Sequence, residues 1–253
     1  MELPRVAVVT GANRGLGRAT AMALARRGFC VVLTYRGDRL EAEGVVRSIR
    51  ELGGEAFPIR LDVADTASID RFADELLAEV GRRWSAGGID VLVNNAGIGL
   101  FAGLHEATVE QFDALFATNV RGPFFLTRAL ARRMGDGGRV VNISTSLTRH
   151  VSAGTSLYAA SKSALETLTR SLAVELGPSG IRVNCIAPGP TATDFNGGAM
   201  RDDANLRETL AGATALGRVG EPEEIADAVA ALASGDLRWV TAERIEVSGG
   251  SLL

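Results

Sequence analysis

Short runs rich in β-branched and apolar residues alternate with segments of helical periodicity along this chain, and this alternation constrains the fold more than any other feature. Several of the runs are apolar without polar alternation, as expected of parallel strands that are covered on both faces. Strand–helix repetition of this kind favours βαβ units wound around one sheet. The sequence therefore predicts an α/β fold.

The expected elements form one continuous pattern without a linker, an internal repeat or a low-complexity tract. We expect a single domain over residues 1–253, with residues 191–216 inserted above the strand ends because they show no strand pattern. The predicted strands are 6–10, 30–34, 56–61, 91–94, 139–143, 182–186 and 244–247. The predicted helices are 17–27, 40–52, 67–84, 109–134, 156–176 and 223–233.

The composition limits the partners and the location of the chain. Of its 253 residues, 46% are hydrophobic and 23% are charged, with a net charge of −3, so nothing marks a nucleic-acid-binding protein. No apolar run approaches the roughly 18 residues of a membrane span. No secretory signal precedes the first strand, so we expect a cytoplasmic protein. Cys30 and Cys185 lie in apolar runs, where free thiols are expected rather than a disulfide or a metal pair.

A glycine-rich turn follows the first predicted strand and leads directly into a helix. The segment reads VAVVTGANRGLGRATAMALARRG, and its turn contains Gly11, Gly15 and Gly17. Glycine lets the backbone turn tightly and approach a pyrophosphate, whose charge the following helix N-terminus favours. The turn therefore predicts a dinucleotide site, although its spacing differs from the usual G-x-G-x-x-G.

Four motifs in this order and at these spacings resemble those of the short-chain dehydrogenase/reductase family. They are TGANRGLG at 10–17, NNAG at 94–97, YAASK at 158–162 and PGPTAT at 188–193. The resemblance covers essentially the whole chain. It implies a Rossmann-like, doubly wound, mostly parallel seven-stranded sheet with helices on both faces, and a cofactor and substrate at the carboxyl ends of the strands. It also implies an assembly of identical chains, a homotetramer or a homodimer.

The residues at the end of the second predicted strand indicate which dinucleotide binds. Tyr35 occupies the place where an acidic residue would accept hydrogen bonds from the ribose and repel a 2′-phosphate. Arg36 follows it, and Arg14 in the glycine turn can reach the same corner. Because arginine binds phosphate bidentately, we predict NADP(H). Asp38 is the alternative ribose-binding acid, but it stands three residues after Tyr35.

The resemblance extends the predicted cofactor site to other segments. It implies that Asp62 contacts the adenine, that residues 94–97 line the cofactor and that Thr193 holds the nicotinamide amide. The predicted cofactor-binding residues are Gly11, Asn13, Arg14, Gly15, Leu16, Gly17, Tyr35, Arg36, Asp62, Val63, Asn94, Ala96, Gly97, Tyr158, Lys162, Pro188, Gly189, Thr191 and Thr193.

The chain has 26 arginines but a single lysine, Lys162, which stands four residues after Tyr158. Residues i and i+4 share one face of a helix. A phenol with a pKa of about 10 is a poor acid near neutrality, but a nearby cation, together with the positive charge of oxidised nicotinamide, lowers that pKa. We therefore predict that Tyr158 exchanges a proton with a ketone or alcohol oxygen and that Lys162 tunes it. A compact ammonium also suits the nicotinamide ribose better than a planar guanidinium.

The group that polarises the substrate carbonyl is expected at the end of the fifth strand. Thr145 stands 13 residues before Tyr158, where family members commonly place a serine. We favour Thr145 and keep Ser144 as the alternative, because a one-residue change in loop length would select it. Asn119 matches the family's helix asparagine, which helps to hold a water between the lysine and solvent. Neither His105 nor His150 has partners at triad or metal-ligand spacing, and no metal site is predicted.

These features favour an NADP(H)-dependent oxidoreductase that transfers hydride between nicotinamide and a small-molecule ketone or secondary alcohol. The enoyl-reductase branch of the family has a different Tyr–Lys spacing and is disfavoured. A non-catalytic NADP(H)-sensing or scaffold protein would need only the glycine turn, so the intact pair argues against that class. The substrate pocket is expected from residues 147–157 and 191–216, whose sequences do not name the substrate.

A 3-oxoacyl-carrier-protein reductase is the alternative enzyme, because the segment PGPTATDF resembles that group. Those enzymes can use basic residues at two positions to dock the carrier, and these positions are occupied by Asp136 and Ser179 here. Arg132, Arg133 and Arg170 could compensate for the missing basic residues.

Overall fold

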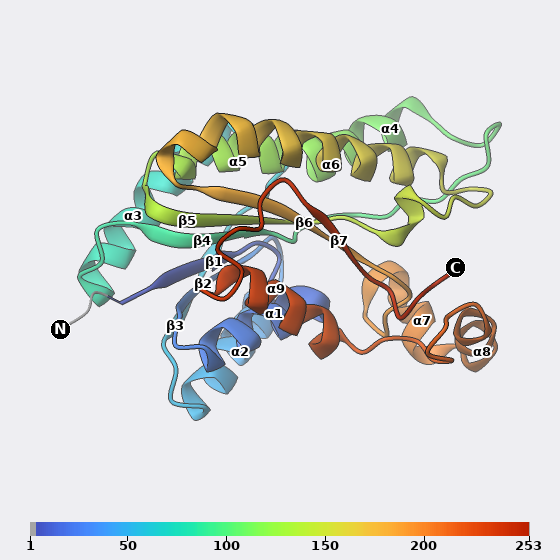
Figure 1. The fold of residues 1–253 in the computed structure, drawn as a ribbon, viewed down its shortest axis with the longest axis horizontal. Helices are drawn as coiled ribbons and strands as arrows, with labels where there is room; N and C mark the ends of the chain where they lie inside the picture. The colour runs from blue at the N-terminus through green and yellow to red at the C-terminus, as the bar shows by residue number, and fades with distance from the viewer. Residues whose placement is uncertain (1–3, 253) are drawn as a thin grey trace.

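The computed structural model describes residues 4–252, in which seven strands form one parallel sheet (Figure 1). The strands are β1 (Val6–Val9), β2 (Cys30–Tyr35), β3 (Ala56–Arg60), β4 (Ile89–Asn94), β5 (Met134–Ile143), β6 (Arg182–Pro188) and β7 (Arg244–Val247). Their order across the sheet is β3-β2-β1-β4-β5-β6-β7, and every neighbouring pair is parallel. This arrangement confirms the predicted doubly wound α/β sheet.

Helices cover both faces of the sheet, as predicted (Figure 1). The helices are α1 (Gly15–Arg26), α2 (Arg39–Glu51), α3 (Ile69–Trp84), α4 (Val109–Phe116), α5 (Gly122–Ala131), α6 (Ser156–Leu176), α7 (Ala199–Asp202), α8 (Ala204–Gly212) and α9 (Pro222–Ala233). One face carries α1, α2 and α9, and the other carries α3, α4, α5 and α6. Among the residues described, each helix is too short or too polar to cross a bilayer.

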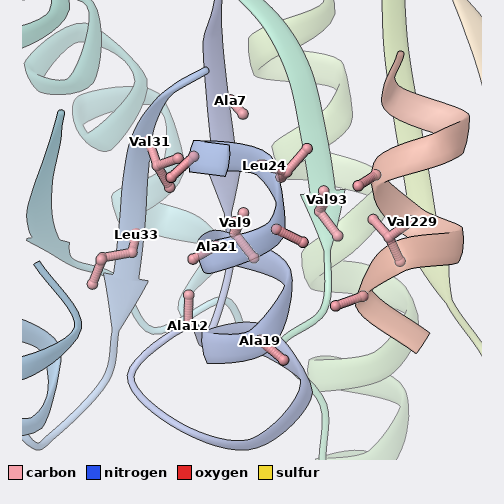
Figure 2. Packing of buried hydrophobic residues seen from close by; sticks show 14 of the residues in the cluster. Ala7, Val9, Ala12, Ala19, Ala21, Leu24, Val31, Leu33, Val93 and Val229 are labelled. Carbon is pink, nitrogen blue, oxygen red and sulfur yellow. The ribbon is translucent and has the colours of Figure 1, made fainter. Parts of the chain in front are cut away.

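Small side chains let α1 pack closely on the sheet. Ala21 and Leu24 of α1 are fully buried, and Figure 2 shows them beside Val9 of β1 and Val93 of β4. Val229 brings α9 into the same cluster, and α1 and α9 pack against each other. Close packing of this kind makes the position of a helix sensitive to the volume of each core side chain. It therefore holds the N-terminus of α1 in a fixed place beside the end of β1.

The prediction of one helix over residues 109–134 was wrong in two ways. The helix contains a π-helical turn, Ala117–Arg121, between α4 and α5, and it ends at Ala131. Met134 instead begins β5 and pairs with Ile89, so this strand starts before the predicted residue 139. The first part of β5 reads MGDGG and lacks the β-branched and aromatic residues that mark strands. Pairing with β4 decides its conformation, and that contact is not visible in a local sequence pattern.

The carboxyl ends of the strands gather several loops at one edge of the sheet. In the sheet, β2 and β3 lie on one side of β1, and β4 to β7 lie on its other side. The strand order therefore reverses between β1 and β4. Ligands of open α/β sheets bind at such a point. Residues 191–216 form a 3₁₀ turn, Phe195–Gly198, followed by α7 and α8, which lie beyond the sheet in Figure 1.

Candidate active site

The glycine turn between β1 and α1 leaves room for a ligand at the helix N-terminus. Gly11 and Gly15 have φ angles of +62° and +54°, which L side chains rarely adopt. A Cβ atom on Gly17 would lie 2.4 Å from the carbonyl oxygen of Gly11. Arg14 occupies the N-cap position of α1 without a side-chain cap, and the first turn has no acidic residue. The open helix N-terminus therefore suits an anion such as a pyrophosphate.

Asn95 holds this turn in place, whereas the sequence analysis included it only within the segment 94–97 and gave its side chain no role. Its Nδ2 donates to the carbonyl oxygens of Thr10, at 2.8 Å, and Gly11, at 3.1 Å. The Thr10 hydroxyl accepts from the backbone N–H groups of Asn95 and Ala96. The second asparagine of the NNAG motif was the signal that could have identified it.

The side chain of the neighbouring Asn94 points into the protein. Its side chain is 3% exposed, and Nδ2 donates to Asn142 at 2.8 Å and to Thr127 at 3.1 Å. These partners lie on β5 and α5, inside the protein. The side chain therefore links the sheet to α5, and only the backbone of Asn94 continues into the NNAG loop.

The corner predicted for the 2′-phosphate contains two exposed arginines, Arg14 and Arg36. Asp38 caps α2 by accepting from the backbone N–H of Glu41 at 3.0 Å, so its carboxylate already has a structural partner. Asn13 donates to Glu41 at 2.7 Å. The corner is thus rich in guanidinium groups, and the alternative ribose acid is engaged in helix capping.

Four further predicted cofactor residues surround this corner. Tyr35 ends β2 with its ring 8% exposed, and it lines a groove between α2 and β3. Asp62 follows β3 and accepts from the backbone N–H of Ala64 at 3.0 Å, and Val63 is buried beside it. Leu16 lies in the first turn of α1 and packs against the core.

Tyr158 and Lys162 lie on α6 and are both buried, at 6% and 4% exposure. The Lys162 Nζ donates to the carbonyl oxygen of Ile143, the last residue of β5, at 2.8 Å. Burial lowers the pKa of Lys162 to about 8. Burial also raises the pKa of Tyr158, against the opposing effect of a hydrogen bond with Thr145. Without the cofactor the pKa of Tyr158 is therefore raised, whereas the sequence analysis predicts that it is lowered when the cofactor is bound.

The two candidate hydroxyls at the end of β5 have different partners. The Thr145 hydroxyl accepts from the backbone N–H of Leu147 at 3.3 Å, and its interaction with the Tyr158 phenol opposes the rise in the pKa of that phenol. The Ser144 hydroxyl donates to Glu166 Oε1 at 2.6 Å. The structure therefore brings Thr145, rather than Ser144, to the phenol.

Asn119 lies in the π-helical turn and is fully buried. Its amide holds Ile98 through two hydrogen bonds, accepting from the backbone N–H and donating to the carbonyl oxygen, each at 3.0 Å. Nδ2 also donates to Ser161 at 3.1 Å, and the Ser161 hydroxyl donates to the Tyr158 carbonyl oxygen. Turns of this kind are frequent at functional sites. Asn119 thus connects the loop after β4 with the helix that carries Tyr158.

Gly97 lies where three of the predicted residues converge. A Cβ atom at this position would lie 3.1 Å from Asn119 Oδ1 and 3.2 Å from Lys162 Nζ. Ala96, the preceding residue, lies close to Gly11 of the glycine turn. The predicted cofactor and catalytic segments are therefore continuous in space.

The segment after β6 completes this edge of the sheet. Pro188 ends the strand, and a Cβ atom on Gly189 would lie 2.7 Å from the Cα of Ser248. Thr191 is buried and donates to the carbonyl oxygen of Gly189 at 2.9 Å. Thr193 is buried beside Gly15, where its Cβ would lie 3.8 Å from a Cβ built on that glycine. This contact brings the predicted nicotinamide-binding segment to the glycine turn.

Two aromatic side chains flank Tyr158: Phe101, which the sequence analysis did not select, and Phe195, which lies in the expected pocket segment 191–216 but was not singled out. The Phe101 ring meets the phenol edge-on with 5.5 Å between centroids, and the Phe195 ring lies at 6.0 Å. Phe101 is 47% exposed, so the phenol lies beneath a partly open aromatic rim. A helical or strand period could not identify these residues, because both lie outside the regular helices and strands.

The remaining candidates lie at the margin of the site. His105 is exposed, and His150 Nε2 lies 3.6 Å from Glu246 Oε1. Cys30 and Cys185 are free thiols, as predicted. Across residues 4–252, no three His, Cys, Asp or Glu side chains gather as a set of metal ligands. The site therefore offers a phenol, an ammonium, hydroxyls and an anion-binding turn, a combination suited to proton transfer beside a dinucleotide.

Comparisons with known proteins agree with this geometry. A family model described as Enoyl-(Acyl carrier protein) reductase matches residues 11–251. A short-chain dehydrogenase/reductase of Pestalotiopsis microspora is 37% identical over 98% of this chain and 95% of its own length.

Two solved structures are also similar over nearly their full length. One is a promiscuous reductase described as catalysing keto-reduction at C1 during lugdunomycin biosynthesis, with a TM-score of 0.94, 38% identity and 99% of both chains covered. The other is an angucycline C-6 ketoreductase with bound NADP, with a TM-score of 0.92, 39% identity, and 98% and 95% of the two chains covered. The matches at these identities and coverages show that this chain belongs to the short-chain dehydrogenase/reductase family.

Proposed function

We propose that this chain is an NADP(H)-dependent oxidoreductase that reduces a small-molecule ketone to a secondary alcohol and oxidises the alcohol in the reverse direction. The observation that carries this proposal is the buried Tyr158 phenol, which interacts with Thr145, at the same strand ends as Lys162 and the glycine turn. Two similar proteins of known structure are described as keto-reducing enzymes, and one of them has bound NADP.

The glycine turn and the nearby arginines fit NADP(H). The uncapped N-terminus of α1 would hold the pyrophosphate, and Arg14 and Arg36 would hold the 2′-phosphate. Thr193, buried against Gly15, would bind the nicotinamide amide. When bound, NADPH supplies the hydride for the reduction.

Four side chains would handle the proton and the carbonyl oxygen. Tyr158 donates its proton to the oxygen as negative charge develops there, and Thr145 donates a hydrogen bond to the same oxygen. Lys162, whose pKa of about 8 leaves it mostly protonated at neutral pH, binds the ribose hydroxyls and stabilises the phenolate that remains. Asn119 supports the path by which a proton returns from solvent, through its contact with Ser161.

The rim around Tyr158 favours a flat aromatic ketone as substrate. Phe101 and Phe195 flank the phenol at centroid distances of 5.5 and 6.0 Å, and aromatic rings attract other rings in offset or edge-on geometries. Residues 147–157 and 191–216 would form the rest of the pocket. We propose that these segments and the nucleotide-binding part belong to one domain.

The carrier-protein alternative is weakened by the location of its candidate basic residues. Arg132 and Arg133 immediately precede β5, at the amino end of the sheet, whereas Tyr158 and Thr145 lie at the carboxyl end. Arg170 is 12 residues beyond Tyr158 on α6, about 18 Å along a helix axis. None of the three is therefore placed at the mouth of the site to receive a carrier-bound substrate.

We also propose that the chain acts in the cytoplasm as a homotetramer or homodimer. A surface groove along α4, α5 and α6 is lined by Phe116, Val120, Phe124 and Leu168, and Val174 of α6 is 77% exposed. A second copy covering this face would remove apolar surface from water. Sedimentation of the purified protein tests this; a monomer at micromolar concentration would contradict it.

The activity is tested by following NADPH oxidation with a panel of aliphatic and aromatic ketones. Tyr158→Phe is the matched variant, since it keeps the ring and removes the proton. We expect turnover by the wild type with at least one ketone and a loss of about 100-fold or more in the variant. NADPH binding should survive in the variant. Tight NADPH binding by the wild type without turnover of any ketone would instead support a non-catalytic sensor.

A further inference from the structure

Four hydroxyl side chains follow one another at the end of β5, in the sequence STSLT, and each could in principle face the substrate. The contacts around this segment show what distinguishes Thr145 from Ser144 and Thr148. They involve two charged residues outside the motifs that define the proposed site, Glu166 and Arg244.

Glu166 continues the helix face that carries the proton-transfer pair. Tyr158, Lys162 and Glu166 stand at i, i+4 and i+8 of α6 and therefore project from one side of the helix. A single oxygen of Glu166, Oε1, accepts three hydrogen bonds. They come from the hydroxyls of Ser144 at 2.6 Å and Thr148 at 2.7 Å and from Arg244 Nε at 2.8 Å.

Arg244, on β7, binds the other side of the same segment. Its Nη2 donates to the carbonyl oxygen of Thr145 at 3.2 Å and to the Thr148 hydroxyl at 3.0 Å. Its Nη1 donates to Glu246 at 2.9 Å. The side chains of Glu166 and Arg244 are each 11% exposed. Charges this far from water are retained at a desolvation cost, which several hydrogen bonds offset here.

These contacts distinguish Thr145 from Ser144 and Thr148. Ser144 and Thr148 give their protons to the Glu166 carboxylate, so those protons are not free to reach a substrate. Arg244 donates to the carbonyl oxygen of Thr145, and the Thr145 side chain interacts with the Tyr158 phenol. We propose that Glu166 and Arg244 are positioning residues, which select Thr145 as the carbonyl-binding hydroxyl by binding its neighbours. This inference rests on the proposed ketone reduction.

The direct test is Glu166→Gln, which keeps the shape of the side chain and removes its charge. A donor displaced by about 1 Å can reduce the rate about 100-fold, so we expect kcat to fall between 10- and 100-fold. NADPH affinity should stay within about twofold, because no proposed cofactor contact changes. The matched control is Glu79→Gln on α3, whose carboxylate binds two arginines of the same helix, Arg82 and Arg83, and no predicted site residue; its kcat should match the wild type.

A double-mutant cycle separates positioning from loss of stability. If Glu166 acts through Thr145, then Glu166→Gln should cost little once Thr145→Val has removed the hydroxyl. A general destabilisation would instead reduce kcat by the same factor in both backgrounds. Thr148→Val provides a variant without a buried charge change if Glu166→Gln does not fold; it should lower kcat with unchanged NADPH affinity.

The outcomes distinguish this inference from the proposed function. Absence of ketone turnover by the wild type would reject both. A wild type that turns over ketones, with Glu166→Gln and Thr148→Val within threefold of its kcat, would reject the positioning role alone. Equal losses from Glu166→Gln with and without the Thr145 hydroxyl would also reject it.

Discussion

Lys162 donates a hydrogen bond to the carbonyl oxygen of Ile143 at 2.8 Å, so the only lysine of the chain is bound to the last residue of strand β5. Ser144 and Thr145 follow Ile143 directly. The contact therefore holds the ammonium beside the start of the segment that carries the strand-end hydroxyls. We expect a compact ammonium to fit this buried place better than the guanidinium that the chain uses at its other basic positions.

We expect Lys162→Arg to lose activity although it keeps the charge. The guanidinium is planar and bulkier, and a displacement of about 1 Å of the phenol or the ribose can cost about 100-fold in kcat. Weaker stabilisation of the phenolate should also move the basic limb of alcohol oxidation to higher pH. Steady-state kinetics across pH, with NADPH affinity measured separately, checks both effects. A near-wild-type kcat and an unmoved profile would show that the lone lysine has no special role.

Burial of Lys162 should appear in the pH dependence of stability. Its pKa falls from 10.5 to about 8 in the folded protein. At pH values between 8 and 10.5, Lys162 is protonated more in the unfolded chain than in the folded protein. The free energy of unfolding therefore increases as pH rises from 8 to 10.5, and this gain is lost as pH falls through 8. Relative to Lys162→Met, the free energy of unfolding should therefore increase across this window, by about 3 kcal/mol at most. Denaturant unfolding of the cofactor-free proteins at several pH values measures the difference, and a constant difference would contradict it.

Arg36→Asp should reverse the cofactor preference. The substitution replaces an attraction for the 2′-phosphate with a repulsion, and we expect the preference for NADPH over NADH to fall by about 100-fold or more. Arg71→Asp, an exposed charge reversal on α3, is the control. Titration of both cofactors against the three proteins checks the prediction. A wild type that binds NADH as tightly as NADPH would contradict it.

The two strand-end hydroxyls are distinguished by conservative substitutions. Thr145→Val keeps the shape and removes the donor, so kcat should fall about 100-fold or more with NADPH affinity nearly unchanged. Ser144→Ala leaves the Thr145 hydroxyl on the phenol and should have a much smaller effect on kcat. If Ser144→Ala shows the large loss instead, the assignment of the carbonyl-binding residue is wrong by one position.

The sequence allowed much of the fold and the centre of the site to be predicted, because those features have local signals. Apolar runs marked the strands, and the i, i+4 spacing placed Tyr158 and Lys162 on one helix face. The glycine turn was recognisable because its backbone angles and close contacts require glycine. The start of β5 at Met134 was missed because its glycine-rich sequence is held by pairing with Ile89 rather than by propensity.

Contacts between distant segments account for the rest of what was missed. Glu166 and Arg244 are separated by 78 residues, and neither belongs to a motif that spacing could reveal. Phe101 and Phe195 reach Tyr158 from irregular segments. The raised pKa of Tyr158 depends on burial by these surroundings, whereas the sequence shows only its charged neighbour.

The central claim is that hydride passes from NADPH to a ketone while Tyr158 supplies the proton. It is tested most directly by a single-turnover measurement with NADPH deuterated at the transferred position, comparing wild type with Tyr158→Phe. The account predicts deuterium on the carbinol carbon of the product and a rate at least about 100-fold lower in the variant, with cofactor binding retained. An unlabelled product, or equal rates in the two proteins, would contradict it.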